Sequence, residues 1–166
     1  VPWFASGMSS GGVFAHTVGA ALDPAGVAAW CASGSAEALA ATSAPTAWFL
    51  AGNDGTFPNA VGEADAYQQQ LAGRGIPGLI LVHPATPLYD ERFLRVDGID
   101  PARSTRIADA LRSSGAVDED DRWLVTGSAA TRTLDTLDGV DGLDPAQQTA
   151  LAAEIEVMAA DHELYD

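Results

Sequence analysis

The sequence predicts an α/β fold in which a mostly parallel sheet has helices on both faces. Short apolar runs at residues 1–5, 27–32, 46–51 and 78–82 alternate with segments of helical pattern, as strands and helices do in α/β proteins. Each run is continuously apolar rather than alternately apolar and polar. That composition is typical of parallel strands that are buried on both faces of the sheet.

Helical patterns fill the intervals between the apolar runs, at residues 12–22, 33–42 and 60–72. The alternation ends near residue 84, where a proline-rich stretch with little periodicity begins. We therefore expect residues 1–83 to form a sheet-containing core and the remainder to be organised differently.

Two helices of the second half are marked by their first residues. Asp100-Pro101 combines an N-cap aspartate with a first-turn proline. Asp144-Pro145 repeats this start for the last helix, where Gln147 completes a capping box. These starts predict a largely helical segment over 84–156, which is followed by a short last segment at 157–166.

The charge balance excludes several classes of partner. The chain has 23 acidic and 8 basic residues, and its formal net charge is −15. All of the basic residues are arginines, because the sequence contains no lysine. Nucleic acids and anionic membrane surfaces bind clustered positive charge, so we expect neither as a partner.

Cys31 is the single cysteine, so no disulfide can form within the chain. It lies in an apolar run, and we interpret it as a buried, unreactive thiol. No apolar run approaches the roughly 18 residues of a membrane span, and no signal peptide is visible. These observations leave the compartment open between the cytoplasm and export.

Residues 7–11, Gly-Met-Ser-Ser-Gly, match the pattern G-x-S-x-G. In this pattern a serine stands on a sharp turn between a strand and a helix, and the glycines on either side leave room for the turn. Ser9 then lies at the N-terminus of the following helix, whose dipole favours developing negative charge. The backbone N–H of Ser10 can donate to a substrate oxyanion. The pattern therefore predicts a nucleophilic serine.

Two other interpretations of this stretch remain open. It could be a glycine-rich turn without chemistry, or a loop that binds phosphate. The spacing does not fit the dinucleotide pattern G-x-G-x-x-G or the Walker loop, and the chain has no lysine to serve a Walker site.

A serine nucleophile needs a base, and the base needs a carboxylate that orients it. In the motif at Ser9 and in the order Ser, Asp, His, the chain resembles the α/β-hydrolase family over its whole length. The resemblance implies an acid just after the second strand beyond the serine, which is Asp54 in Gly-Asn-Asp-Gly-Thr. The alternative is an Asp-Gly turn that merely ends a strand. Asp65, inside a predicted helix, is the weaker candidate acid.

Three histidines are candidates for the base. His16 lies in the helix after the motif, two turns from Ser9, and we interpret it as a surface or packing residue. His83 directly follows the fourth strand, where the simplest family members place their base. His162 stands in Ala-Asp-His-Glu-Leu-Tyr, which looks like the ending of bacterial esterases and polyester-depolymerase-like hydrolases. We favour His162 and keep His83 as the alternative base.

Two acidic stretches are candidate metal sites. Residues 118–121 are four consecutive acidic residues, and we interpret them as a solvated turn rather than a calcium site. Aspartates also recur every third residue at positions 135, 138, 141 and 144, but this spacing is not that of an EF-hand loop. We expect no metal.

The resemblance also concerns the extent of the chain. A whole family member has several strands before the nucleophile strand, and the second oxyanion N–H comes from a loop among them. We expect this chain to be the C-terminal portion of the fold, completed by a preceding segment or a second chain. The strand at 1–5 would then be an inner strand with one neighbour outside the chain, and the insertion over 84–156 would be lid-like.

The resemblance implies a serine hydrolase that cleaves small-molecule carboxylic esters through an acyl-enzyme. Ser9 attacks the ester, His162 accepts its proton, and Asp54 stabilises the imidazolium. No metal or organic cofactor is implied. Two alternatives from other classes stay open, namely a non-catalytic hydrolase-fold binding module and a doubly wound domain that binds a phosphate-containing ligand. The sequence leaves ester, thioester, lactone and amide substrates undistinguished.

Overall fold

The computed structural model describes residues 1–137 and 139–162, and it divides the chain into two compact units, the first ending at His83 and the second beginning at Pro84. The first unit contains four strands, which are β1 (Phe4–Met8), β2 (Gly26–Trp30), β3 (Thr46–Ala51) and β4 (Gly78–His83). Their order in the sheet is β1-β2-β3-β4, and every neighbouring pair is parallel. The α/β fold and the parallel sheet are therefore as predicted.

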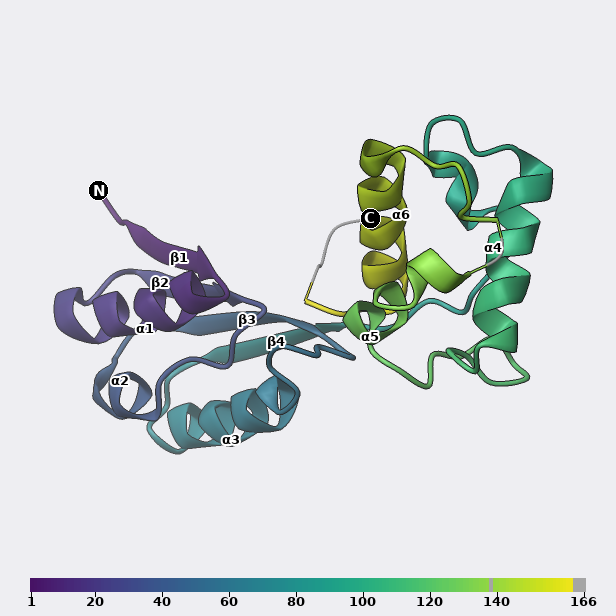
Figure 1. Ribbon diagram of the computed structural model, residues 1–166. Coiled ribbons are helices and arrows are strands. Elements are labelled where there is room, and N and C mark those ends of the chain that lie inside the picture. The colour runs from purple at the N-terminus through teal and green to yellow at the C-terminus, as the bar shows by residue number, and fades with distance from the viewer. Residues whose placement is uncertain (138, 163–166) are drawn as a thin grey trace. The chain divides into compact units, whose positions relative to one another are not determined.

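Three helices connect the strands, namely α1 (Ser10–Leu22), α2 (Ala36–Ala41) and α3 (Ala60–Gly73) (Figure 1). They pack on one face of the sheet. Val27 of β2 packs with Ala15 of α1, whereas Ala29, two residues further on, packs with Ala64 of α3. Residues two apart on a strand share a face, so α1 and α3 cover the same side.

The expectation of helices on both faces of the sheet is wrong for the helices of this unit. The strands follow one another across the sheet in chain order, so each crossover moves in the same direction. Right-handed crossovers then place every connecting helix on the same side. Helices on both faces would require the winding direction to reverse within the sheet.

The other face of the sheet is nevertheless apolar, which explains the continuously apolar runs. Trp30 and Phe49 stack there, with their ring centroids 4.0 Å apart. Leu79 and Leu81 follow on β4, and their exposed fractions are 52% and 49%. The pattern thus reported two apolar faces correctly but did not determine what lies on the second.

The second unit has its own helical core. It contains α4 (Pro101–Ser113), α5 (Gly127–Thr131), α6 (Pro145–Met158) and two short 3-10 helices, η1 (Arg92–Arg95) and η2 (Leu134–Thr136). The largest side chains of its core are fully buried, namely Phe93, Ile107, Leu111, Leu151, Ile155 and Met158. No described helix of the chain combines the length and the apolar composition that a membrane crossing requires.

Both predicted helix starts in this unit are confirmed. The side chain of Asp100 accepts a hydrogen bond from the N–H of Arg103 at the start of α4. Asp144 and Gln147 form the reciprocal capping box at the start of α6. The last helix runs to Met158, past the expected boundary at 156, because Leu151, Ile155 and Met158 form one buried stripe. The N–H of Thr86 also donates a hydrogen bond to the carbonyl of Met158. The expected insertion over 84–156 and the start of the segment at 157–166 therefore belong to the same compact unit.

Candidate active site

Ser9 stands alone between the last residue of β1 and the first residue of α1. Its backbone has φ 55° and ψ −127°, a conformation that side-chain-bearing residues rarely adopt and that costs about 1–3 kcal/mol. The Ser9 N–H donates to the carbonyl of Trp30 at 2.8 Å, which continues the ladder between β1 and β2. The sharp strand-to-helix turn that the motif predicts is therefore present, with the serine at its apex.

The two glycines of the motif differ in whether the surrounding structure leaves room for a side chain. A Cβ on Gly7 would collide with the backbone carbonyl of Gly11, so Gly7 is required for the close approach of β1 and α1. A Cβ on Gly11 would meet nothing within 4 Å. Gly12 is the second tight position, because its Cβ would lie 3.0 Å from the carbonyl oxygen of Gly7 and 3.1 Å from Cβ of Ala32. The expectation that both motif glycines are sterically required is correct for Gly7 only.

The backbone N–H of Ser10 opens α1, where a helix has no internal acceptor for its first N–H groups. Within the part of the chain that the structure describes, this N–H donates to no other group. It is therefore available as a donor beside the hydroxyl-bearing Ser9, where the helix dipole also favours negative charge.

Asp54 follows β3 and is 5% exposed. Its Oδ1 accepts hydrogen bonds from the backbone N–H groups of Thr56 and Phe57, each at 2.8 Å. Phe57 in turn packs against the core around Trp48 and Leu71. The Asp-Gly sequence does form a turn, and that turn holds the carboxylate of a buried residue in one orientation. Asp65, the weaker candidate acid, is exposed on α3.

Ser9 and Asp54 lie at the same edge of the sheet, because each follows the carboxyl end of a parallel strand. Strand β2 lies between their strands. With neighbouring strands about 4.8 Å apart, two steps separate the strand ends by roughly 10 Å. That separation is too large for direct contact, and a third group must connect the two if they act together.

His83 ends β4, at the same edge of the sheet. It is in register with Ala51, and its carbonyl accepts a hydrogen bond from the N–H of Gly52 at 2.9 Å. Among the residues described in the structure, the His83 imidazole makes no hydrogen bond to Asp54 or to any other group. The first unit therefore brings His83 to the same end of the sheet as Ser9 and Asp54.

His162 lies in the second unit and is half-buried. Its backbone N–H donates to Oδ1 of Asp161 at 2.9 Å, and Oδ2 of Asp161 accepts from the N–H of Ser128 at 2.6 Å. Asp161 is 2% exposed, so this buried carboxylate anchors the segment before His162 to the start of α5. Sequence reasoning missed this role of Asp161. The remainder of the family-like ending, residues 163–166, lies outside the described residues.

His16 is a packing residue and not a surface one, since it is 2% exposed in α1. Its ring meets the edge of Trp48 at a centroid distance of 5.9 Å and an interplanar angle of 88°. Among the described residues, neither ring nitrogen has a hydrogen-bond partner. Burial lowers the pKa of His16 from its usual 6.5 to about 4, so the ring is neutral at physiological pH.

No group of three or more potential metal ligands occurs among the described residues, which leave out Asp138 and the side chain of Asp135. Oδ1 of Asp118 accepts from the N–H groups of Asp120 and Arg122, which closes a turn. Asp121 accepts a hydrogen bond from the guanidinium of Arg112, which lowers the pKa of the Asp121 carboxyl.

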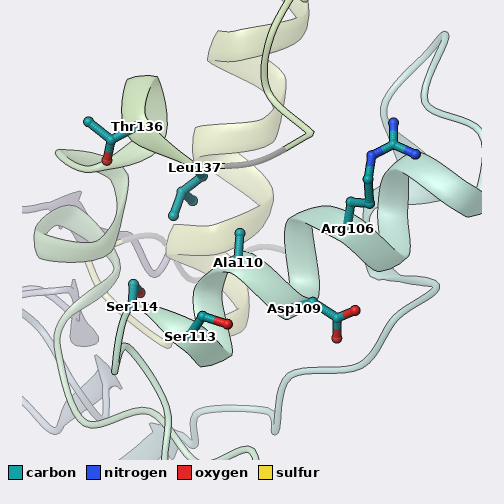
Figure 2. Close-up of a pocket in the computed structure, with 7 residues that line it drawn as sticks. All are labelled: Arg106, Asp109, Ala110, Ser113, Ser114, Thr136 and Leu137. Atoms are coloured by element: carbon teal, nitrogen blue, oxygen red, sulfur yellow. The ribbon is translucent and has the colours of Figure 1, made fainter.

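A hollow of about 420 Å³ lies beside α4 in the second unit, and Figure 2 shows Ala110 and Leu137 on facing sides of it. Two of the hydroxyl groups that line it are already used, since Ser114 donates to the carbonyl of Leu111 and Thr136 to that of Thr133. None of the candidate catalytic residues lines this hollow. It is therefore no part of the candidate active site.

Comparison of the chain with protein-family models, curated proteins and solved structures gave no match.

Proposed function

We propose that this chain carries the nucleophile and the acid of a serine hydrolase of the α/β-hydrolase type, which cleaves carboxylic esters through an acyl-enzyme. The observation that carries the proposal is the backbone of Ser9, a residue with a side chain held at φ 55° between a strand and a helix. Strain of this kind persists where the surrounding structure enforces it, and it clusters at functional sites. The ψ of −127° sets Ser9 apart from Asp23, which has φ 46° and ψ 62° in the ordinary left-handed region.

The proposed reaction uses each group in turn. The Ser9 hydroxyl attacks the ester carbonyl while the base accepts its proton, and the Ser10 N–H donates to the oxyanion that forms. The base then protonates the departing alcohol, and water hydrolyses the acyl-enzyme by the same steps. Asp54 holds the base in the correct tautomer and stabilises its protonated form. No step requires a metal or an organic cofactor.

We propose His162 as the base, with the second unit as the lid-like insertion that leads to it. Its sequence context supports this choice, because His162 stands in Ala-Asp-His-Glu-Leu-Tyr, which looks like the ending of bacterial esterases. In the full chain, His162→Ala should abolish esterase activity while His83→Ala retains a substantial part of it. The reverse result would move the base to His83 and leave the second unit outside the triad.

The nucleophile is tested by covalent labelling. A fluorophosphonate should label the wild-type chain, and peptide mapping should find the label on Ser9. Ser9→Ala should lose labelling and should lower kcat for nitrophenyl esters by several orders of magnitude, on the order of 10⁶-fold when a nucleophile is removed. The matched control is Ser10→Ala, which removes the neighbouring hydroxyl but keeps the backbone N–H that the proposal uses.

The same experiment separates the proposal from a non-catalytic binding module. A folded wild-type chain that is not labelled and turns over no nitrophenyl ester would support the binding module and refute the hydrolase. A series of nitrophenyl esters of increasing acyl length would then define the substrate class of an active protein.

A further inference from the structure

The buried side of α1 is made almost entirely of small residues. Its buried positions are Gly12, Ala15, His16 and Gly19. The helix consequently lies very close to the sheet, and a Cβ on Gly19 would be only 2.6 Å from Cγ2 of Val27. His16 is the one large side chain among these fully buried positions, while Val18 is half-buried and packs against the cluster around Val27. The size of His16 therefore bears directly on how the helix sits on the sheet along that stretch.

The His16 ring packs against the loop that follows β2. A Cβ on Gly34 would collide with Nδ1 and Cε1 of the ring, and Gly34 itself has φ 110°, where glycine is favoured. On its other side the ring meets Trp48, whose Nε1–H donates to the carbonyl of Ser33 at 2.7 Å. The imidazole thus fills the space enclosed by α1, β3 and the loop at residues 33–34.

The same loop supports the turn at Ser9. Gly12 precedes His16 by four residues and lies on the same stripe of α1. Its Cα approaches Ala32, as shown by the 3.1 Å between a Cβ built on Gly12 and Cβ of Ala32. The helix therefore touches the loop twice, once behind the serine turn and once, one helical turn later, through His16.

We infer that His16 is a positioning residue for the hydrolysis proposed above: its bulk, wedged between α1 and Gly34, holds the start of α1 so that the Ser9 hydroxyl and the Ser10 N–H keep their places. The inference rests on the proposed function, because it concerns the same site. His16 acts by volume and not by hydrogen bonding, since both ring nitrogens are unpartnered. A helix moves as a rigid body, so a shift at His16 is transmitted to the first residues of α1.

The test compares three variants of the full chain in their second-order rate of fluorophosphonate labelling. His16→Ala removes the volume and should slow labelling on the order of tenfold to a hundredfold, as small displacements of reacting groups do. His16→Leu keeps a similar volume without polar atoms, and should label at close to the wild-type rate. Phe14→Ala is the matched control, because Phe14 lies on the exposed side of the same helix at 67% exposure.

Thermal denaturation of each variant separates positioning from folding. We expect His16→Leu to be at least as stable as the wild type, since it removes two unsatisfied buried nitrogens. If His16→Ala does not fold, the labelling rates of His16→Leu and His16→Val are compared instead. Valine is intermediate in volume between alanine and leucine, so His16→Val should label more slowly than His16→Leu. Slow labelling by a folded His16→Leu would show that volume is not the determinant, and wild-type labelling by His16→Ala or His16→Val would also overturn the inference.

The proposed function fails in a different way. If the wild-type chain is not labelled at all, the hydrolase proposal fails. If the wild type is labelled on Ser9 and every folded His16 variant is labelled equally fast, the hydrolase proposal stands and the role of His16 fails.

Discussion

At the scale of single residues, Asp54 is held by its own loop. The two backbone N–H groups that bond Oδ1 fix the carboxylate before any substrate binds. A triad carboxylate needs such fixation, because its task is to hold the base in one tautomer. The burial of Asp54 and its place after β3 therefore support the role that the family resemblance implies.

Asp54→Asn should reduce kcat for ester hydrolysis by on the order of 10³–10⁴-fold, with little change in KM. The amide keeps the shape of the side chain but cannot stabilise the imidazolium. Steady-state kinetics with a nitrophenyl ester measure the effect, and Asp65→Asn on the exposed side of α3 is the control. If Asp54→Asn kept the wild-type kcat, the proposed role of Asp54 as the triad carboxylate would be wrong.

The buried His16 makes stability depend on pH. Its pKa is about 4 in the folded chain and 6.5 in the unfolded chain, so the unfolded chain binds the proton more tightly. Stability should be full above pH 6.5, fall as the pH drops towards 4, and level off below it. The loss from this group is about 3 kcal/mol.

Denaturant unfolding of the wild type and of His16→Leu between pH 4 and pH 7 measures this contribution. The leucine variant should lack that part of the decline, because it has no group to protonate. Parallel pH profiles for the two proteins would contradict the assignment of the decline to His16.

At the scale of elements, the serine turn depends on one glycine more than on the other. Gly7→Ala places a methyl group against the carbonyl of Gly11, whereas Gly11→Ala points into open space. We expect Gly7→Ala to destabilise the first unit strongly and to abolish activity. Gly11→Ala should keep the fold, and alanine should stabilise the helix relative to glycine by up to about 1 kcal/mol.

Thermal denaturation and circular dichroism of the two alanine variants test this asymmetry, each variant being the control for the other. Equal destabilisation by both substitutions would contradict the steric difference between Gly7 and Gly11.

At the scale of the whole molecule, the face of the sheet opposite to α1–α3 has a physical consequence. Phe4 is 70% exposed, and Leu79 and Leu81 on β4 are about half exposed. Strand β1 is an edge strand of this sheet, with β2 as its one partner among the described strands. Exposed apolar surface next to an open strand edge promotes association between chains.

We therefore expect the 166-residue chain alone to associate or to require a partner segment for solubility. Size-exclusion chromatography with light scattering would show species larger than the 17.1 kDa chain. Replacement of Leu79 and Leu81 by threonine should reduce the association, because these side chains supply part of the apolar face. A monodisperse monomer of the unaltered chain over a wide concentration range would refute this expectation.

Features set by neighbouring residues could be predicted from the sequence alone. The apolar runs of β2, β3 and β4, the helix starts at Asp100 and Asp144, and the sharp turn at Ser9 are each recorded in residues close together in the chain. Apolar periodicity, capping side chains and the serine motif therefore report them directly. The first strand was placed less well, since the run at 1–5 corresponds to a strand at Phe4–Met8.

Other features were decided only by tertiary structure, because they depend on residues far apart in the chain. The side of the sheet that the helices cover follows from the winding direction of three successive crossovers. The need for glycine at position 12 arises from Ala32, and the burial of His16 arises from Gly34 and Trp48. The sequence shows that a residue is apolar or small. Which distant residue it contacts depends on how the elements pack in three dimensions.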